Sequence, residues 1–243
     1  MEDPKILNVV WVGTGVMGAA MCKFLLARPD LYRVSVHNRT KARTDELVSM
    51  GATWVDLAQL QTPNTFDIMI LMVLGPTEVE ALLITEKLID NLPEGAVIID
   101  HTSSSPAVAR KLASAASQRN IFSIDAPVSG GDTGAKNGTL QIMAGGSHTG
   151  FDRAKTIMEK YSKSITHMGA AGFGQHTKIA NQILLVANIQ GFCESYIYAL
   201  KAELDLDLWY EIISTGSARN FIINWIGPRV MAGDFNTGFA AAL

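Results

Sequence analysis

A glycine-rich turn near the start of the chain has the residue types that bind phosphate groups. Gly13-Thr14-Gly15-Val16-Met17-Gly18 directly follows a short apolar run over residues 8–12. In a strand–turn–helix unit, the first glycine permits the tight turn, the second lets the backbone approach a pyrophosphate, and the third allows close packing. The helix N-terminus then offers N–H groups and a positive dipole end. Because this motif alone is weak evidence, an ordinary strand–helix turn is the alternative, but the strand and helix it requires are both expected here. Residues 8–40 are therefore predicted to bind a dinucleotide.

The residues after the second expected strand indicate which dinucleotide is bound. Sites for NAD usually place a carboxylate there, where it accepts a hydrogen bond from the ribose 2′-hydroxyl. This chain has His37-Asn38-Arg39-Thr40 instead. A guanidinium can pair with a 2′-phosphate, which a carboxylate would repel. NADP(H) is therefore favoured over NAD(H), and the alternative is that Arg39 is only a solvated loop residue.

Two later segments have polar groups suited to a small anionic substrate. Asp125-Ala126-Pro127-Val128-Ser129-Gly130-Gly131 ends another expected strand. A hydroxyl beside consecutive glycines offers a side-chain donor and backbone N–H groups to an anion. Farther on, Lys178 falls in the first turns of a long helical segment, and Asn181 and Gln182 follow it. Spacings of three and four residues place these side chains on one helical face.

The elements that must position these residues alternate along the first two thirds of the chain. Strands are predicted over residues 8–12, 33–37, 68–73, 97–100 and 122–126, and helices over 16–28, 41–50, 76–90 and 105–119. This alternation predicts an α/β fold, a doubly wound parallel sheet of Rossmann type with helices on both faces. The pattern changes at 165–172, and helices are predicted over 175–200, 207–214 and 221–230. We therefore expect a dinucleotide-binding domain over residues 1–168 and a helical domain over 169–243.

The bulk composition excludes several classes of protein. The 243 residues are 48% hydrophobic and 18% charged, enough for a sizeable core, and the net charge of −3 comes with no basic block typical of nucleic-acid binding. The chain starts without a signal or transit pattern, and apolar runs are interrupted before they reach the length of a membrane span. A soluble, cytoplasmic protein is expected, with Cys22 and Cys193 as buried, reduced thiols; a disulfide between them is the alternative.

The order of the motifs resembles the β-hydroxyacid dehydrogenase family. That family includes 3-hydroxyisobutyrate dehydrogenase, tartronate semialdehyde reductase and the glyoxylate/succinic semialdehyde reductases, with phosphogluconate dehydrogenase more distant. The motifs that carry the resemblance are Gly13–Met21, Asp100–Pro106, Asp125–Leu140, Gly172–Gln182, and Asp234-Phe235 with Gly238-Phe239. The resemblance implies an oxidoreductase that passes hydride between a nicotinamide and a small aldehyde, keto acid or β-hydroxy acid.

The resemblance also implies a role for particular residues. Lys178 matches the catalytic lysine, which acts as general acid toward a carbonyl or general base toward a hydroxyl. Ser129, Gly130 and Gly131 match the loop that binds the substrate carboxylate, and Asn181 and Gln182 match the polar pair facing the substrate. The implied cofactor-binding residues are Gly13, Thr14, Gly15, Val16, Met17, Gly18, Asn38, Arg39, Thr40, Leu74, Thr102 and Ser103. The alternative for Lys178 is a surface lysine at a helix start.

The sequence departs from the family at three places. Gln182 stands where many relatives have asparagine, although the tartronate semialdehyde type also has Asn-Gln, and Ser103 stands where threonine is usual. The chain ends at Leu243, before the second lysine and the further helices of the family, so the helical domain is expected to be truncated. A weakly catalytic dinucleotide-binding scaffold or sensor is therefore the alternative function. As in relatives, a homodimer or homotetramer is expected, and no metal site is expected.

Overall fold

The computed structural model describes residues 6–63 and 65–234, which form two compact units. The first unit runs to Lys178 and is an α/β domain, and the second begins at Ile179 and is helical. The first turns of the long helix therefore belong to the first unit, whereas the sequence boundary after residue 168 assigns them to the second. Phe235, Gly238 and Phe239, part of the last sequence motif, lie outside the described residues.

The first unit is built on a mixed sheet in which parallel pairing predominates. In the described part of the chain its strands are β1 (Leu7–Val12), β2 (Tyr32–His37), β3 (Thr53–Trp54), β4 (Ile68–Leu71), β5 (Val97–Asp100), β6 (Phe122–Asp125), β7 (Val128–Ser129), β8 (Leu140–Gly145) and β9 (Ser162–Gly169). They follow the order β3-β2-β1-β4-β5-β6-β8-β7, with β9 paired to β8. The strands from β3 to β6 are parallel, and β8 runs antiparallel to β6 and β7. The strand order reverses between β1 and β4, and ligands of such sheets bind at the carboxyl ends of the strands at that point.

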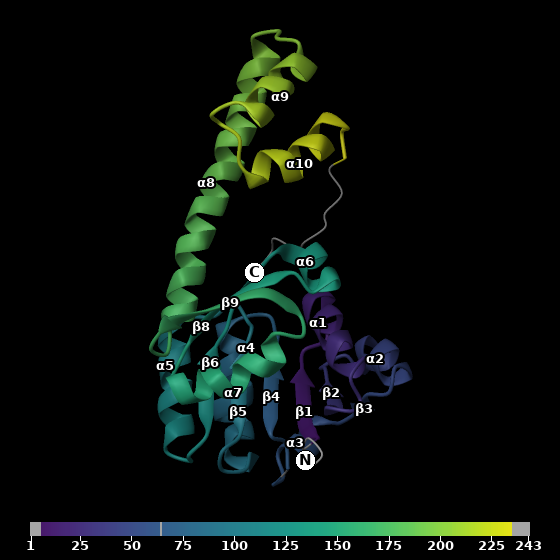
Figure 1. Cartoon of the computed structure of the whole chain (residues 1–243), viewed down its shortest axis with the longest axis vertical. Coiled ribbons are helices and arrows are strands. Elements are labelled where there is room, and N and C mark those ends of the chain that lie inside the picture. The colour runs from purple at the N-terminus through teal and green to yellow at the C-terminus, as the bar shows by residue number, and fades with distance from the viewer. Residues whose placement is uncertain (1–5, 64, 235–243) are drawn as a thin grey trace. The chain divides into compact units, whose positions relative to one another are not determined.

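Helices cover both faces of this sheet (Figure 1). Because side chains alternate along a strand, Val9 and Trp11 of β1 enter one apolar cluster while Val10 and Val12 enter the other. The first cluster also contains side chains from α1 (Val16–Leu26), α2 (Asp45–Ser49) and α7 (His148–Met158). The second contains side chains from α3 (Leu57–Leu60), α4 (Pro76–Glu80) and α5 (Pro106–Ser117). Two buried layers therefore fix the strand ends at which α1, α6 (Gly131–Asn137) and the site loops begin.

The Rossmann-type fold expected from the sequence is confirmed, with differences in individual elements. The expected helix over 41–50 is a 3-10 turn, Lys41–Thr44, followed by α2. The expected helix over 76–90 consists of α4, a π-helical turn, Ala81–Thr85, and a 3-10 turn, Leu88–Asn91; Lys87, with φ +56°, interrupts it. The thiols also differ, because Cys22 is buried as expected but Cys193 is exposed; both are free.

The second unit contains most of α8 (Phe173–Lys201), together with α9 (Leu206–Thr215) and α10 (Phe221–Met231). Asp205 and Asn220 cap α9 and α10 by accepting backbone N–H groups. Tyr210 of α9 donates its hydroxyl to the carbonyl of Ile223 at 3.3 Å, which joins these two helices. The short loops and cap residues explain why both helices were predictable from sequence.

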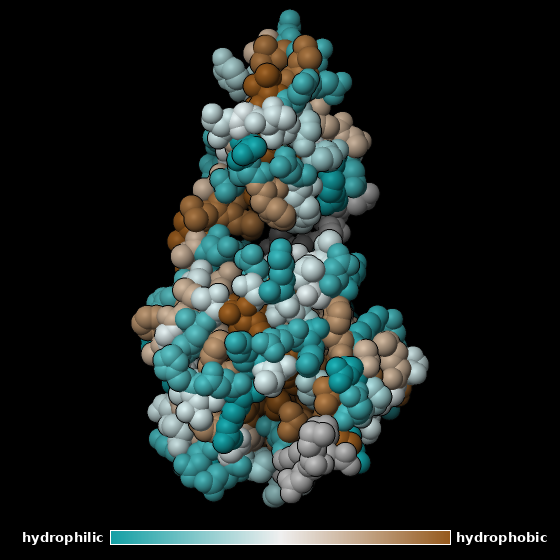
Figure 2. Space-filling view, viewed as in Figure 1, coloured by the Kyte–Doolittle hydropathy of each residue, from teal (hydrophilic) through white to brown (hydrophobic). Residues whose placement is uncertain are grey.

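Helix α8 exposes several large apolar side chains along its length. Ile183, Leu184 and Tyr198 are all more than 60% exposed, and Figure 2 shows apolar side chains gathered along this helix. Of the described helices, α8 alone has the length and apolar composition of a membrane span. The sequence analysis expected no segment with these properties. Core helices of soluble proteins meet the same test when they are mostly buried, but only 11% of this apolar window is buried. Asn181, Gln182 and Asn188 are polar residues within the helix.

A buried aromatic cluster lies beneath the carboxyl ends of β1 and β5. Trp11, His101 and Tyr161 are fully buried and their rings are in mutual contact. His101 Nδ1 lies 2.6 Å from the Ala126 carbonyl oxygen, and Nε2 lies 2.8 Å from the Tyr161 hydroxyl. Since a carbonyl only accepts, Nδ1 carries the proton and Nε2 accepts from the tyrosine. Burial lowers the pKa of His101 to about 4, so the imidazole is neutral near pH 7.

This buried imidazole makes stability depend on pH. In the unfolded chain His101 binds a proton as pH falls below its ordinary pKa of about 6.5. In the folded chain it stays neutral until pH approaches its lowered pKa of about 4. We expect the stability advantage of the wild type over His101→Gln to narrow by about 2 kcal/mol between pH 7 and pH 4.5. Urea unfolding of both proteins at the two pH values measures this difference. An advantage that stays constant would contradict the assignment of a neutral, buried histidine.

Candidate active site

The three glycines of the turn after β1 occupy positions that a larger residue would disturb. Gly13 has a φ of +95°, and a Cβ atom there would lie 2.2 Å from the carbonyl oxygen of Met72. A Cβ atom on Gly18 would lie 2.0 Å from the Gly13 carbonyl oxygen. A Cβ on Gly15 would meet nothing within 4 Å. The first and third glycines therefore close the turn, while the second faces open space at the start of α1.

That open space fits the pyrophosphate of a dinucleotide. Gly15 is the N-cap of α1 and makes no side-chain cap, so the helix start is open to an anionic ligand. The hydroxyl of Thr14 is buried without a hydrogen-bond partner. The Thr14 N–H donates to Asn38 Oδ1 at 3.1 Å, and Asn38 Nδ2 donates to the Thr40 carbonyl at 2.9 Å. Asn38 thus links the glycine turn to the loop after β2, on which Arg39 is exposed.

The loops after β4 and β5 are joined to each other. The Thr102 hydroxyl accepts the N–H of Val73 at 3.1 Å, and Asp100 Oδ1 accepts the N–H of Thr102 at 3.0 Å. Burial raises the pKa of Asp100 to about 7. Leu74 is 60% exposed, and Ser103 is exposed as well. Of the three residues that the sequence assigned to the cofactor on these loops, Leu74 and Ser103 are therefore exposed at the switch point of the sheet, whereas Thr102 is buried and its hydroxyl is bonded within the protein.

Lys178 reaches the loop that contains the predicted anion-binding residues. Its Nζ donates to the carbonyl oxygen of Val128 at 2.8 Å, one residue before Ser129. Gly130 and Gly131 have φ values of +134° and +64°, which turn the chain from β7 into α6. Burial lowers the pKa of the Lys178 ammonium, because the neutral carbonyl only partly replaces water. The structure therefore brings Lys178 and the Ser129–Gly131 loop together within the first unit.

The start of α8 is held by a buried carboxylate at the end of β6. Asp125 is 3% exposed, and its two oxygens accept the N–H groups of Gly172 at 2.8 Å and Gln175 at 2.9 Å. A Cβ on Gly174 would lie 2.5 Å from the Asp125 carbonyl oxygen, so only glycine allows this approach. Burial raises the pKa of Asp125 while these hydrogen bonds lower it. Asp125 therefore determines where α8 begins, and with it the position of Lys178.

Asn181 and Gln182 follow Lys178 on α8 but belong to the second unit. Asn181 Nδ2 donates to Gln182 Oε1 at 3.0 Å, and both side chains are partly buried. In this structure the two amide groups are therefore hydrogen-bonded to each other. Their role toward a substrate stays a prediction.

Two residues that sequence reasoning left without a role contribute to this arrangement. His101 lies within the Asp100–Pro106 motif and was given no function, yet it is fully buried against the Ala126 carbonyl. Gln175 was quoted in the motif and given no function, yet it is 1% exposed and its side chain bonds Thr102 and Ser104. A polar residue directly after a buried strand is a usable signal for the first. For the second, no sequence signal identified the partner loop, 71 and 73 residues away.

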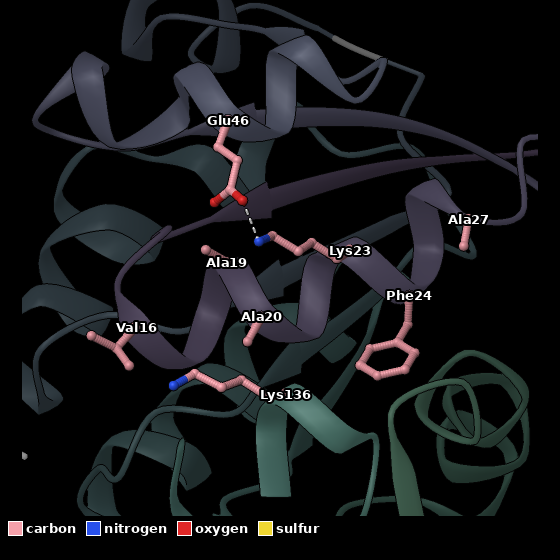
Figure 3. A pocket seen from close by; sticks show the side chains of 8 residues that line it. All are labelled: Val16, Ala19, Ala20, Lys23, Phe24, Ala27, Glu46 and Lys136. Carbon is pink, nitrogen blue, oxygen red and sulfur yellow. Dashed lines mark hydrogen bonds and ion pairs between the residues drawn. The ribbon is translucent and has the colours of Figure 1, made fainter. Parts of the chain in front are cut away.

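A surface depression of about 560 Å³ is lined by residues of α1, α2 and α6. Figure 3 shows Lys23 paired with Glu46 at one side and Lys136 at another, over an apolar floor. Only Val16 of the glycine turn contributes to its lining. Across residues 6–63 and 65–234, no three His, Cys, Asp or Glu side chains gather as a metal site would require.

Comparisons with known families match both halves of the chain. Residues 8–169 match the NAD binding domain of 6-phosphogluconate dehydrogenase, and residues 172–243 match the NAD-binding region of NADP-dependent 3-hydroxyisobutyrate dehydrogenase. The chain belongs to the β-hydroxyacid dehydrogenase family. It is thus an oxidoreductase with a nicotinamide-dinucleotide-binding domain, as the motifs had indicated.

Individual relatives agree with this membership. The chain is 41% identical to probable 3-hydroxyisobutyrate dehydrogenase-like 1, mitochondrial, of Arabidopsis thaliana, over 97% of this chain and 70% of that protein. It is 35% identical to 2-hydroxy-3-oxopropionate reductase of Escherichia coli, over 98% and 80%. The structure of Mycobacterium tuberculosis 3-hydroxyisobutyrate dehydrogenase with L-serine shares the fold, with a TM-score of 0.86 and 23% identity over 97% of this chain and 82% of that chain. Psf3 in complex with NADP⁺ and 2-OPP has a TM-score of 0.81 and 26% identity over 93% and 79%.

The Asp125 cap predicts a measurable loss of stability. Asn at this position has one acceptor in place of two, so one buried N–H at the start of α8 loses its partner. We expect Asp125→Asn to lower the free energy of unfolding at pH 7 by about 1–3 kcal/mol. Asp30→Asn, which removes only the exposed charge that pairs with Arg28, is the matched control and should leave the free energy of unfolding nearly unchanged. Equal effects of the two substitutions in urea unfolding would show that Asp125 does not hold the helix.

Proposed function

We propose that this chain is an NADPH-dependent reductase of a small aldehyde or keto acid, or the NADP⁺-dependent dehydrogenase of the matching β-hydroxy acid, with Lys178 as the general acid/base. The observation that supports it is the Lys178 ammonium, partly buried and donating to the Val128 carbonyl at 2.8 Å beside Ser129. A lysine held there on a helix can deliver a proton to a substrate bound at the neighbouring loop.

The nicotinamide, when bound, supplies or accepts the hydride. In the reductive direction Lys178 Nζ gives a proton to the carbonyl oxygen as the hydride reaches the carbonyl carbon, so the product is an alcohol. In the reverse direction the neutral amine takes the hydroxyl proton. Because burial lowers the pKa of Lys178, both forms of the amine are closer in free energy than they are for a solvated lysine.

A small carboxylate fits the loop beside this lysine. Ser129 brings a hydroxyl donor, and the backbone at Gly130 and Gly131 turns with positive φ, leaving space that side chains would otherwise fill. Asn181 and Gln182 would add amide groups to the substrate. The relative named 2-hydroxy-3-oxopropionate reductase and those named 3-hydroxyisobutyrate dehydrogenase support a substrate of this size and charge.

The loop after β2 supports NADP(H) as the cofactor. It has no carboxylate to accept from a ribose 2′-hydroxyl, and Arg39 is exposed beside Asn38, whose side chain is already used by Thr14 and Thr40. The Lys41 ammonium lies 4.1 Å from the centre of the Trp54 ring, and this contact holds it close to the same loop. A 2′-phosphate would therefore meet positive charge there.

Replacement of the proposed general acid should remove turnover and leave the cofactor bound. We expect Lys178→Ala to lower kcat at least 100-fold, because positioned acid–base groups contribute about 10²–10⁴ in rate. The assay is NADPH oxidation with a panel of short aldehydes and keto acids, including glyoxylate and succinic semialdehyde. Lys201→Ala, at an exposed position on the same helix, is the control and should keep full activity.

The outcomes of this assay separate the two functions. An unchanged kcat in Lys178→Ala would refute the role of the lysine. Wild-type protein that binds NADPH but oxidises it with no member of the panel would favour a dinucleotide-binding scaffold or sensor over an enzyme.

Arg39 should determine the preference between the two nicotinamide cofactors. Fluorescence titration is expected to show NADPH bound more tightly than NADH. Loss of a charged hydrogen-bonding partner costs about 1.5–3 kcal/mol, so Arg39→Ser should weaken NADPH about 10- to 100-fold and leave NADH nearly unchanged. Arg33→Ser, at an exposed position on β2, controls for net charge. Equal affinities of the wild type for the two cofactors would remove the NADPH assignment.

A further inference from the structure

The side chain of Gln175 is buried and makes hydrogen bonds with both ends of its amide. Its Oε1 accepts the N–H of Ser104 at 2.9 Å, and its Nε2 donates to the carbonyl oxygen of Thr102 at 2.8 Å. The side chain is part of a residue only 1% exposed. One amide on α8 therefore satisfies two backbone groups of the loop between β5 and α5.

The same residue is held from the other side by the end of β6. Its backbone N–H donates to Asp125 Oδ2 at 2.9 Å, and this bond fixes the position of the helix start relative to the sheet. Lys178 follows three residues later on α8, so it lies on the same side of the helix as Gln175. Gln175 and Lys178 thus connect α8 to Asp125 of β6, to the loop after β5 and to the Val128 carbonyl from within a single turn of the helix.

The loop held by Gln175 lies at the switch point of the sheet. Thr102 is also tied to Val73 of the loop after β4. Ser103 is exposed between the two groups that Gln175 bonds, and the Ser104 hydroxyl is buried without a partner. The hydrogen bonds between Gln175 and the backbone of this loop therefore fix the position of the loop relative to α8, the helix that contains Lys178.

We propose that Gln175 is a positioning residue that fixes the distance between the Thr102–Ser104 loop and the ammonium of Lys178 through its paired amide hydrogen bonds. This rests on the proposed reductase function, in which hydride and proton must reach one carbonyl group from two different segments of the chain. A displacement of about 1 Å in such an arrangement can cost 10²-fold in rate.

The chemistry of an amide explains why glutamine suits this position. The loop presents one acceptor and one donor, and an uncharged amide matches both at no cost in buried charge. Glutamate at this position would retain the acceptor for Ser104 but would set a second oxygen against the Thr102 carbonyl. Methionine would fill nearly the same volume with neither hydrogen bond.

The test uses Gln175→Met and Gln175→Glu in the full chain, with Gln118→Met as the matched control. Gln118 is exposed at the end of α5 and bonds neither loop. Single-turnover oxidation of bound NADPH by the best aldehyde of the panel gives a rate, which reports geometry, and an amplitude, which counts active sites. Hydrogen exchange at the Ser104 amide measures the tether directly and requires no turnover.

We expect Gln175→Met to lower the single-turnover rate at least tenfold. Its amplitude and its NADPH dissociation constant should stay within about threefold of the wild-type values, and so should the rate of the Gln118→Met control. Exchange at Ser104 should become faster, while exchange at Gly15 should not change. If Gln175→Met does not fold, the same measurements are made on Gln175→Glu, which keeps the acceptor for Ser104 and sets an oxygen in place of the donor to Thr102.

Other results would overturn the proposal. An unchanged rate, or a loss confined to the amplitude, would show that Gln175 serves only to stabilise the fold. Wild-type protein without turnover would instead defeat the proposed reductase function. In that case unchanged exchange at Ser104 in the variants overturns the tether, and faster exchange supports it.

Discussion

The geometry of the site depends on how one buried carboxylate accepts two backbone N–H groups. Asp125 ends β6 and binds the N–H groups of Gly172 and Gln175, so the first turn of α8 is anchored to the sheet itself. Helix starts leave N–H groups without partners, and burying them uncapped is costly. Because α8 must begin at this point, Lys178 and Gln175 are set relative to the ends of β5 and β7 before any ligand binds.

Glycine makes that anchoring and the cofactor turn sterically possible. Gly145 and Gly174 approach Asp125 so closely that a Cβ atom on either would overlap its oxygens. Gly13 and Gly18 pack against each other in the same way at the start of α1. The two helices that carry the site therefore leave the sheet at positions fixed by close backbone contact, and rigid elements hold functional groups more precisely than loops do.

The sequence predicted the parts of the structure that have a local signature. The apolar β-branched run at 8–12, the glycine turn and the long helix each depend on neighbouring residues, so their pattern was sufficient. The short strands β3 and β7 and the helix α7, which contains Gly150, lack such a pattern. The bonds from Gln175 to Thr102 and Ser104 and from His101 to Tyr161 join residues at least 60 positions apart, and no local pattern encodes them.

The electrostatic environment of Lys178 depends on which hydrogen bonds the charged groups of the site already make. The negative charge of Asp125 is directed at backbone N–H groups. Lys178 donates to a neutral carbonyl and, within residues 6–63 and 65–234, is not hydrogen-bonded to a carboxylate. A carboxylate beside the ammonium would raise the pKa of Lys178, whereas burial against a carbonyl lowers it. The same fold thereby positions the lysine and weakens its hold on the proton, which is the property that a reversible proton donor needs.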